Sequence, residues 1–232
     1  MVCNLRCEHV CYIWISGKKL YTTQMKLTSE SKLFLGIIAI SVAIIGIASV
    51  VLTKPAPTFS TTEVMPKGTY TKGNPNANVV LVEFSDFQCP ACLAVKPTLD
   101  AIIAKYSDKM LFAYRHFPLD QHPFSHKAAQ AAEAAGAQGK FWEMYDVLFA
   151  NQQKFSDTLF SDLAKQLSLD MTKFEADMKS TGLTNRVGVD QADGTRFGVN
   201  STPSFFLNGK KLELSSFDDL TKAVDEAVAA AK

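Results

Sequence analysis

The sequence predicts an α/β domain with a helical insertion, preceded by one N-terminal transmembrane helix. Three observations predict this fold class: an uncharged apolar run over residues 33–52, a strand, helix and strand pattern over residues 79–117, and a hairpin followed by a helix after residue 203. Between the second strand and the hairpin, apolar residues recur at helical spacing. We therefore expect a βαβ unit and a hairpin to form one sheet, with helices inserted between them.

The run over residues 33–52 is long and apolar enough to cross a membrane. At 1.5 Å per residue, a helix over this run spans about 30 Å, the thickness of the bilayer hydrocarbon. Basic residues lie upstream, whereas only Lys54 follows closely, so the positive-inside rule makes residues 1–32 a cytoplasmic tail and the following domain extracytoplasmic. The run is longer than the apolar part of a signal peptide, and no small-x-small cleavage site follows it. We expect a single-pass, uncleaved signal anchor that contacts membrane lipid.

The first 24 residues differ from the rest of the chain. They contain three cysteines at a spacing of four residues, which on a helix would share one face: Cys3, Cys7 and Cys11. Only Glu8 and His9 could add ligands there, so we expect no metal site. Met25 is followed by Lys26 and an apolar run, as at a natural start. We interpret residues 1–24 as an over-long translation start.

A linker is predicted between the membrane helix and the domain. Residues 53–72 are rich in Pro, Thr and Gly, although residues 61–65 are predicted as a short first strand. Residues 73–232 are long enough to bury one hydrophobic core. The chain has 24 Lys and Arg against 23 Asp and Glu. Because this balance leaves no basic excess, we expect no nucleic-acid partner.

The βαβ pattern places one cysteine at the start of a helix. Residues 79–84 are mostly apolar and β-branched, which predicts a buried strand, and residues 86–88 form the turn after it. Residues 90–106 show helical spacing of apolar side chains. Pro90 suits the first helical position, because the N–H that it lacks is not needed there. Cys89 therefore lies at a helix N-terminus.

The segment Cys89-Pro90-Ala91-Cys92 predicts a redox pair in an active-site loop. Unpaired N–H groups and the positive end of the helix dipole favour a thiolate at Cys89, which makes it the expected exposed nucleophile. Cys92 lies one turn further on and is expected to face inward, as a thiol, until it attacks the mixed disulfide on Cys89. The redox-active group is then the Cys89–Cys92 disulfide, and no separate cofactor is expected.

Other interpretations of the pair have less support. A structural disulfide would close a very short loop and would stabilise the fold little. A zinc site would lack half of its ligands, because no other cysteine follows residue 53. Three histidines could suggest a cysteine protease: His116, His122 and His126. No orienting third group or oxyanion hole accompanies them, so we expect solvated or structural histidines.

The remaining segments complete the sheet around the insertion. Residues 110–117 predict a second strand, parallel to the first because such crossovers are right-handed. The insertion covers about residues 119–197. The helices predicted within it cover residues 122–138, 140–150, 158–167 and 171–179. Residues 204–207 and 210–214, joined by Asn208-Gly209, predict a hairpin before the last helix.

Four segments resemble a known family. They are residues 79–92 with the CxxC pair, 115–118 (Arg-His-Phe-Pro), 139–142 (Gly-Lys-Phe-Trp) and 202–205 (Thr-Pro-Ser-Phe). Together they are similar to the DsbA-like thiol-disulfide oxidoreductases, over nearly all of residues 73–232. The resemblance implies a thioredoxin-like fold with a helical insertion.

The same resemblance implies roles for further residues. Pro203 matches the family's cis-proline, which leaves the backbone of Thr202 free to pair with an extended substrate peptide. Glu83 matches a buried acid that can exchange a proton with Cys92. Ala91 departs from the histidine found in strongly oxidising members, so we expect a milder oxidant.

The resemblance implies a protein-disulfide oxidoreductase, which we expect to introduce disulfides into exported cysteine-containing polypeptides. A substrate thiolate would attack Cys89, and a membrane quinone-linked reoxidase would restore the disulfide. Two alternatives remain. One is a disulfide reductase or isomerase of the same fold, and the other is a non-catalytic thioredoxin-fold module that binds extended peptides or a metal.

Overall fold

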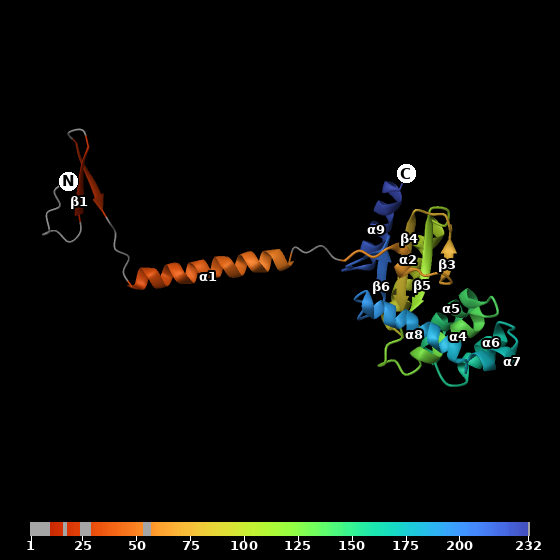
Figure 1. Cartoon of the computed structure of the whole chain (residues 1–232). Coiled ribbons are helices and arrows are strands. Elements are labelled where there is room, and N and C mark those ends of the chain that lie inside the picture. The colour runs from red at the N-terminus through yellow and green to blue at the C-terminus, as the bar shows by residue number, and fades with distance from the viewer. Residues whose placement is uncertain (1–9, 16–17, 24–28, 53–56, 232) are drawn as a thin grey trace. The chain divides into compact units, whose positions relative to one another are not determined.

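The computed structural model describes residues 10–15, 18–23, 29–52 and 57–231. The chain divides into two compact units, Met1–Pro55 and Ala56–Lys232 (Figure 1).

The first unit opens with a hairpin. Strand β1 (Val10–Ile15) pairs antiparallel with β2 (Lys18–Thr23). Cys11 lies in β1, so a helical face shared by the N-terminal cysteines is wrong for that residue. Cys3, Cys7 and the proposed start at Met25 lie outside the described residues.

Helix α1 (Ser29–Leu52) contains the predicted apolar run and begins four residues before it. Within it, Ser29–Ile47 has a mean hydropathy of 2.0, and by length and composition this segment can cross a membrane. Apolar side chains such as Ile38 and Ile45 are more than half exposed. Because a water-exposed helix rarely carries apolar side chains on all sides, α1 is suited to membrane anchoring.

The second unit is built on a five-stranded sheet. Its order is β3-β5-β4-β6-β7, in which β4 and β5 are parallel and the other neighbours are antiparallel. This arrangement confirms the predicted α/β fold, its parallel β4-α3-β5 unit and its helical insertion. In chain order the elements are α2 (Thr61–Val64), β3 (Tyr70–Gly73), β4 (Val79–Ser85), α3 (Pro90–Lys105), β5 (Met110–His116), α4 (Ser125–Gly136), α5 (Phe141–Ala150), the 3-10 helix η1 (Gln152–Lys154), α6 (Leu159–Gln166), α7 (Met171–Asp177), α8 (Thr181–Arg196), β6 (Ser204–Leu207), β7 (Lys210–Lys211) and α9 (Phe217–Ala230).

Side chains from the two faces of the sheet form two hydrophobic cores. On one face Leu81 packs with residues of α3 and α5, including Leu99 and Tyr145. On the other face Phe84 packs with Phe197 and other aromatic side chains. All of β4 is buried, as predicted for a central strand covered on both sides. Figure 1 shows helices α4 to α7 gathered at one end of this sheet.

Arg115 of β5 links the sheet to α8, the last helix of the insertion, through ion pairs. Its side chain is fully buried, and it donates from Nε to Asp190 and from Nη2 to Asp193, both at 2.8 Å. These aspartates lie on α8, which the sequence does not predict as a separate helix, because its three glycines lower helix propensity. One of these glycines, Gly194, lets α8 approach the Phe117 ring closely, since a Cβ at position 194 would lie 2.7 Å from that ring. Ion pairing and close packing therefore stabilise a weak helix former.

The start of the domain differs from the sequence-based expectation. The strand predicted over residues 61–65 is wrong, because Ser60 and Glu63 form a capping box that begins helix α2 there. The compact unit begins at Ala56, so residues 57–72 of the predicted linker fold with the domain. Residues 53–56 lie outside the described residues.

The predicted hairpin is present, with a second strand of only two residues. Asn208 (φ 49°) and Gly209 (φ 82°) have the positive φ values of a type I′ turn between β6 and β7. A Cβ at Gly209 would collide with the carbonyl oxygen of Phe59. Gly209 therefore serves both the turn and the close passage of the chain that leads into α2.

Replacing Arg115 with methionine should lower the free energy of unfolding by about 3 kcal/mol, because two partly buried aspartates would lose its guanidinium charge. Asp190 would keep the His116 N–H, and Asp193 would keep the half-exposed Arg196. Urea unfolding followed by circular dichroism measures this change. The exposed pair of Lys165 with Asp162 provides a matched control, and Lys165→Met should cost less than about 1 kcal/mol. Equal losses in the two variants would contradict the anchoring role of Arg115.

Candidate active site

The two cysteines lie at the N-terminus of α3, as the sequence predicts. Cys89 is the N-cap residue, Pro90 opens the helix and Cys92 lies in its first turn, with the two thiols unbonded. Cys92 is 1% exposed and faces inward as expected. Cys89 is 6% exposed, which corrects the expectation of an exposed nucleophile. The reason is that the Thr202 carbonyl lies 3.3 Å from its sulfur.

The surroundings make Cys89 the acidic thiol of the pair. The pKa of Cys89 is lowered to about 5, chiefly by the hydrogen bond from the Cys92 side chain. Burial raises this pKa and so opposes the effect. Thr202 and the backbone N–H groups of Ala91 and Cys92 lower it further. Burial raises the pKa of the Cys92 thiol well above its usual value, and the contact with Cys89 and the charge of Glu83 raise it further. At neutral pH Cys89 is therefore a thiolate and Cys92 a thiol.

Asp86 holds the turn before α3. Its buried carboxylate accepts the backbone N–H of Gln88 at 2.8 Å and that of Leu119 at 3.0 Å, and it lies 2.7 Å from His122 Nδ1. Its backbone carbonyl accepts the N–H of Cys89 at 3.0 Å. The sequence predicts the turn but not this cluster, because Leu119 lies 33 residues and His122 36 residues after Asp86.

Gln152 connects the insertion to the cysteine loop. It is 4% exposed, and its Nε2 donates to the carbonyl oxygens of Phe87 and Cys89, both at 2.9 Å. From another side, the Gln88 Oε1 accepts the N–H of Phe124 at 2.6 Å. The two bonds of Gln152 fix the Phe87–Gln88 and Cys89–Pro90 peptide groups, and hence the start of α3. No local pattern reveals Gln152, which lies 63 residues after Cys89.

Glu83 is buried in β4 near the cysteine pair. It is 1% exposed, and burial raises its pKa to about 8, while hydrogen bonding by Ser85 opposes this rise. The charge of Glu83 in turn raises the pKa of Cys92, so the two groups are electrostatic neighbours. A carboxyl group with a pKa close to neutral pH is suited to giving and taking protons.

The Thr202-Pro203 peptide bond is cis, as the resemblance implies. In its thiol form Cys89 donates to the Thr202 carbonyl, which is 113 residues away in the chain. The loop before β6 and the start of α3 therefore meet at the reactive sulfur. The structure thus brings the sequence-predicted residues Cys89, Cys92, Glu83, Thr202 and Pro203 together at one edge of the sheet.

Two of the three histidines are partners of buried carboxylates. His116 Nε2 lies 3.1 Å from Glu133 Oε1, with both side chains 2% exposed, and His122 pairs with Asp86. His126 is half exposed and lies 3.3 Å from Asp120. Among the residues that the structure describes, no histidine forms a hydrogen bond with Cys89 or Cys92, whose thiols interact with each other, with Thr202 and with Ser85. This arrangement favours structural histidines over a protease dyad.

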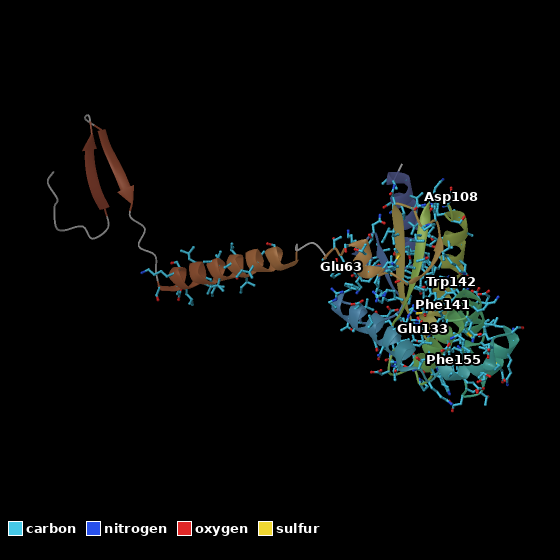
Figure 2. The ribbon with its side chains drawn as sticks, turned by 45° about the vertical axis from the view of Figure 1, so that its right-hand side comes forward. Glu63, Asp108, Glu133, Phe141, Trp142 and Phe155 are labelled. Atoms are coloured by element: carbon cyan, nitrogen blue, oxygen red, sulfur yellow. The ribbon has the colours of Figure 1, made fainter. Side chains whose placement is uncertain are left out.

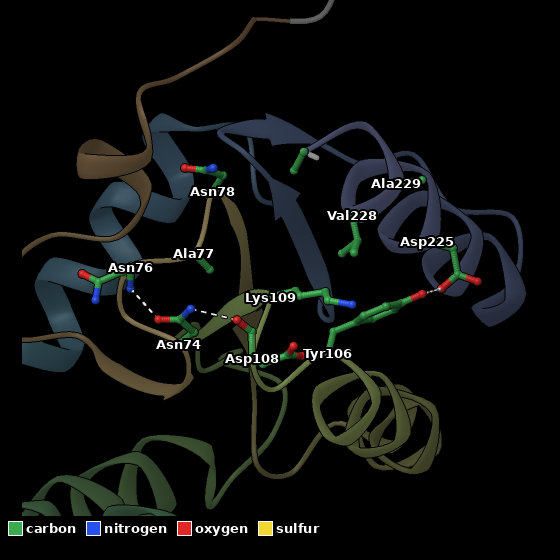
Figure 3. Close-up of a pocket in the computed structure, with 11 residues that line it drawn as sticks. Asn74, Asn76, Ala77, Asn78, Tyr106, Asp108, Lys109, Asp225, Val228 and Ala229 are labelled. Atoms are coloured by element: carbon green, nitrogen blue, oxygen red, sulfur yellow. Dashed lines mark hydrogen bonds between the residues drawn. The ribbon is translucent and has the colours of Figure 1, made fainter.

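A pocket of about 480 Å³ lies away from the cysteines (Figure 3). It is lined by residues that precede β4, residues that follow α3 and residues at the end of α9. The length of α3, 16 residues or about 24 Å, separates it from Cys89. Its polar groups bond to each other: Asn74 Nδ2 donates to the Asp108 carbonyl at 2.8 Å, and Tyr106 Oη donates to Asp225 at 2.7 Å. The pocket therefore takes no part in the cysteine chemistry.

Most of the second unit is similar to a known family. Residues 66–226, more than half of the chain, match the family model described as Thioredoxin. The chain belongs to the thioredoxin family. The thioredoxin match includes both cysteines, Glu83 and the cis-proline, so it covers the complete candidate site.

Solved structures with this thioredoxin fold include thiol-disulfide exchange proteins. The thiol-disulfide exchange protein alpha-DsbA2 from Wolbachia pipientis is 23% identical, with a TM-score of 0.64 over 72% of this chain and 90% of that chain. A thioredoxin-like oxidoreductase from Silicibacter pomeroyi DSS-3 is 26% identical, with a TM-score of 0.64 over 75% of this chain and 100% of that chain. These structures confirm the thioredoxin-like fold that the DsbA-like resemblance implies.

Curated relatives include much longer proteins. The Na(+)/H(+) antiporter NhaA 1 of Mycobacterium sp. (strain KMS) is 40% identical over 154 residues, which are 64% of this chain and 25% of the antiporter. The chain thus spans about a quarter of the length of the curated relatives that it matches. Because the antiporter name describes the whole of that protein, we infer no ion transport by this chain from the match.

The reduced protein should gain the ultraviolet absorbance of a thiolate as the pH rises through about 5. In a Cys92→Ala variant the midpoint should move to higher pH, because the leading hydrogen bond to the Cys89 sulfur is lost. Cys89→Ser should abolish the transition. If the transition persisted in Cys89→Ser, the thiolate would belong to another group.

Glu83 should make the protein less stable as the pH rises from about 4.5 to about 8. Over that range the folded protein keeps a proton on Glu83 that the unfolded chain has released, since the folded pKa is raised to about 8. In Glu83→Gln this part of the pH dependence should disappear. Urea unfolding of the oxidised protein at a series of pH values measures it without thiol titration, and parallel curves for the two proteins would contradict the buried acid.

Proposed function

We propose that the chain is a membrane-anchored, extracytoplasmic protein-disulfide oxidoreductase that introduces disulfides into exported proteins. The observation that carries the proposal is the asymmetry of the pair, in which the pKa of Cys89 is lowered to about 5 while that of Cys92 is raised. A site that stabilises a thiolate stabilises the reduced form of the pair. A pair with a stable reduced form oxidises other thiols.

The geometry supports a division of labour between the two sulfurs. A substrate thiolate attacks the Cys89 sulfur, the Cys89–Cys92 bond breaks, and Cys92 leaves with the electron pair and takes up a proton, which Glu83 can supply. A second substrate thiolate then attacks the substrate sulfur of the mixed disulfide and releases Cys89 as a thiolate. Because Cys89 has the lower pKa, it is the better leaving group in this second step.

The backbone beside the cis-proline supports binding of an extended peptide. The Thr202 carbonyl lies 3.3 Å from the Cys89 sulfur, so a peptide that pairs with the backbone of Thr202 would bring its own cysteine close to that sulfur. Backbone pairing is tolerant of side-chain identity. This suits an enzyme whose substrates are many different exported cysteine-containing polypeptides.

The apolar helix supports a location at the cell membrane. With residues 1–32 in the cytoplasm and residues 33–52 in lipid, the thioredoxin-like domain stands in an oxidising compartment, where disulfides persist. Anchoring also holds the domain beside a membrane quinone-linked reoxidase, the partner that would restore the Cys89–Cys92 disulfide after each turnover.

The reduction potential tests the direction of electron flow. The full chain, with Cys3, Cys7 and Cys11 replaced by serine, is equilibrated in detergent against defined glutathione mixtures and its thiols are trapped. On a scale where DsbA lies near −120 mV and thioredoxin near −270 mV, a value less negative than about −200 mV supports an oxidase. A value near −270 mV or below would favour the reductase, and a pair that forms no reversible disulfide would leave only the binding module.

Ala91→His provides a matched variant for this measurement. A histidine in the first turn of α3 adds a positive charge near the Cys89 thiolate, an interaction worth up to about 1 kcal/mol, or about 20 mV for a two-electron couple. The potential should become less negative by about that amount. An unchanged potential would show that position 91 does not influence the thiolate.

A further inference from the structure

The proposed reaction requires a proton route for Cys92. This thiol takes up one proton when the disulfide is opened and releases one when the disulfide forms again. Cys92 and Glu83 are each 1% exposed, so neither meets bulk water directly. Glu83 can hold one proton, but that proton must itself be exchanged with solvent between turnovers.

Polar groups continue from Cys92 along the same face of the sheet. Ser85 follows Glu83 by two positions in β4, so both side chains lie on one face. The Ser85 hydroxyl is close enough to lower the pKa of both the Glu83 carboxyl and the Cys92 thiol by hydrogen bonding. Ser85 is therefore next to the group that must gain and lose the proton.

Ser85 has a titratable neighbour on the adjacent strand. It pairs with His116 in the parallel register of β4 and β5, which places the two side chains side by side on the same face. Within the described residues, the Ser85 hydroxyl and His116 Nδ1 are both buried and neither makes a hydrogen bond of standard geometry. Each can therefore serve as the partner of the other.

His116 leads on to the surface of the insertion. Its Nε2 lies 3.1 Å from Glu133 Oε1, and Glu133 Oε2 lies 3.1 Å from Arg186 Nε and 3.3 Å from Tyr70 Oη. Glu133, labelled in Figure 2, is 2% exposed but lines a pocket of about 450 Å³ together with Arg186, whose side chain is 47% exposed. The carboxylate thus lies between a buried imidazole and a pocket at the surface.

We infer that Ser85, His116 and Glu133 form a proton path between Cys92 and this pocket. When Cys92 is deprotonated to attack the mixed disulfide, its proton passes to the Ser85 oxygen while the Ser85 proton moves to His116 Nδ1. The His116 Nε2 proton moves to Glu133 and from there to water in the pocket. An imidazole suits this role because it can accept a proton at one nitrogen and release one from the other. The inference rests on the proposed thiol-disulfide exchange.

Rapid mixing of the reduced protein with excess oxidised glutathione separates the two chemical steps. The test uses the full chain with serine at positions 3, 7 and 11, and acid quenching with mass spectrometry distinguishes the mixed disulfide from the Cys89–Cys92 disulfide. In Ser85→Ala and His116→Gln the second step should slow by about a hundredfold or more, the usual size of general acid-base effects. The first step should keep its rate, because Cys89 already reacts as a thiolate.

Two further readouts separate a proton path from a packing effect. In heavy water the second step of both variants should slow more than that of the parent protein, because proton transfer has become limiting. Ser85→Thr keeps a hydroxyl and should restore the rate, whereas Ser125→Ala removes another buried hydroxyl without a hydrogen bond and should leave it unchanged.

Specific outcomes would overturn the inference. If the second step of Ser85→Ala and His116→Gln stayed within about twofold of the parent rate, or slowed without a larger isotope effect, these residues would not carry the proton. If the parent protein formed no Cys89–Cys92 disulfide, the proposed function itself would fail, and the path with it.

Discussion

The meeting of the α3 N-terminus with the Thr202 carbonyl at the Cys89 sulfur is the constraint on which the rest of the site depends. It follows from strand direction. β4 and β5 are parallel and end at the same edge of the sheet, while β6 runs antiparallel to β4 and begins there, with Ser204 opposite Phe84. The turn before α3, the loop after β5 and the cis-proline loop therefore converge, although they lie far apart in the sequence.

Small differences in position give two identical side chains pKa values that are shifted in opposite directions. Cys89 lies just outside the helix, where N–H groups and the Cys92 thiol stabilise its negative charge. Cys92 lies in the first turn, within the hydrophobic core, where a charge would lose its hydration. The same burial keeps Glu83 protonated close to neutral pH. An acidic thiol, a thiol of raised pKa and a buried acid thus result from different positions relative to the same helix end and to solvent.

Local chemistry made much of this predictable from the sequence. Pro90 after Cys89 predicts the helix start, Asn208-Gly209 predicts the turn, and the apolar run over residues 33–52 predicts the long helix. Prediction was wrong at residues 61–65, where side-chain capping outweighs β propensity, and incomplete at α8, whose glycines are compensated by Arg115. The pairs of Asp86 with His122 and of His116 with Glu133 depend on tertiary packing, so no sequence spacing reveals them.

The two hydrogen bonds of Gln152 make the helical insertion part of the support of the cysteine loop. An insertion is usually regarded as an addition to a complete core, which could be removed without loss to the older parts. Here, excision of residues 119–197 would remove the amide that orients the carbonyl oxygens of Phe87 and Cys89, together with two groups bonded to the Asp86 carboxylate. The CxxC motif would survive in the sequence, but the Phe87–Gln88 and Cys89–Pro90 peptide groups would lose the side-chain hydrogen bonds that orient them. The insertion and the CxxC loop therefore constitute a single structural unit, and substitutions in one are constrained by the other.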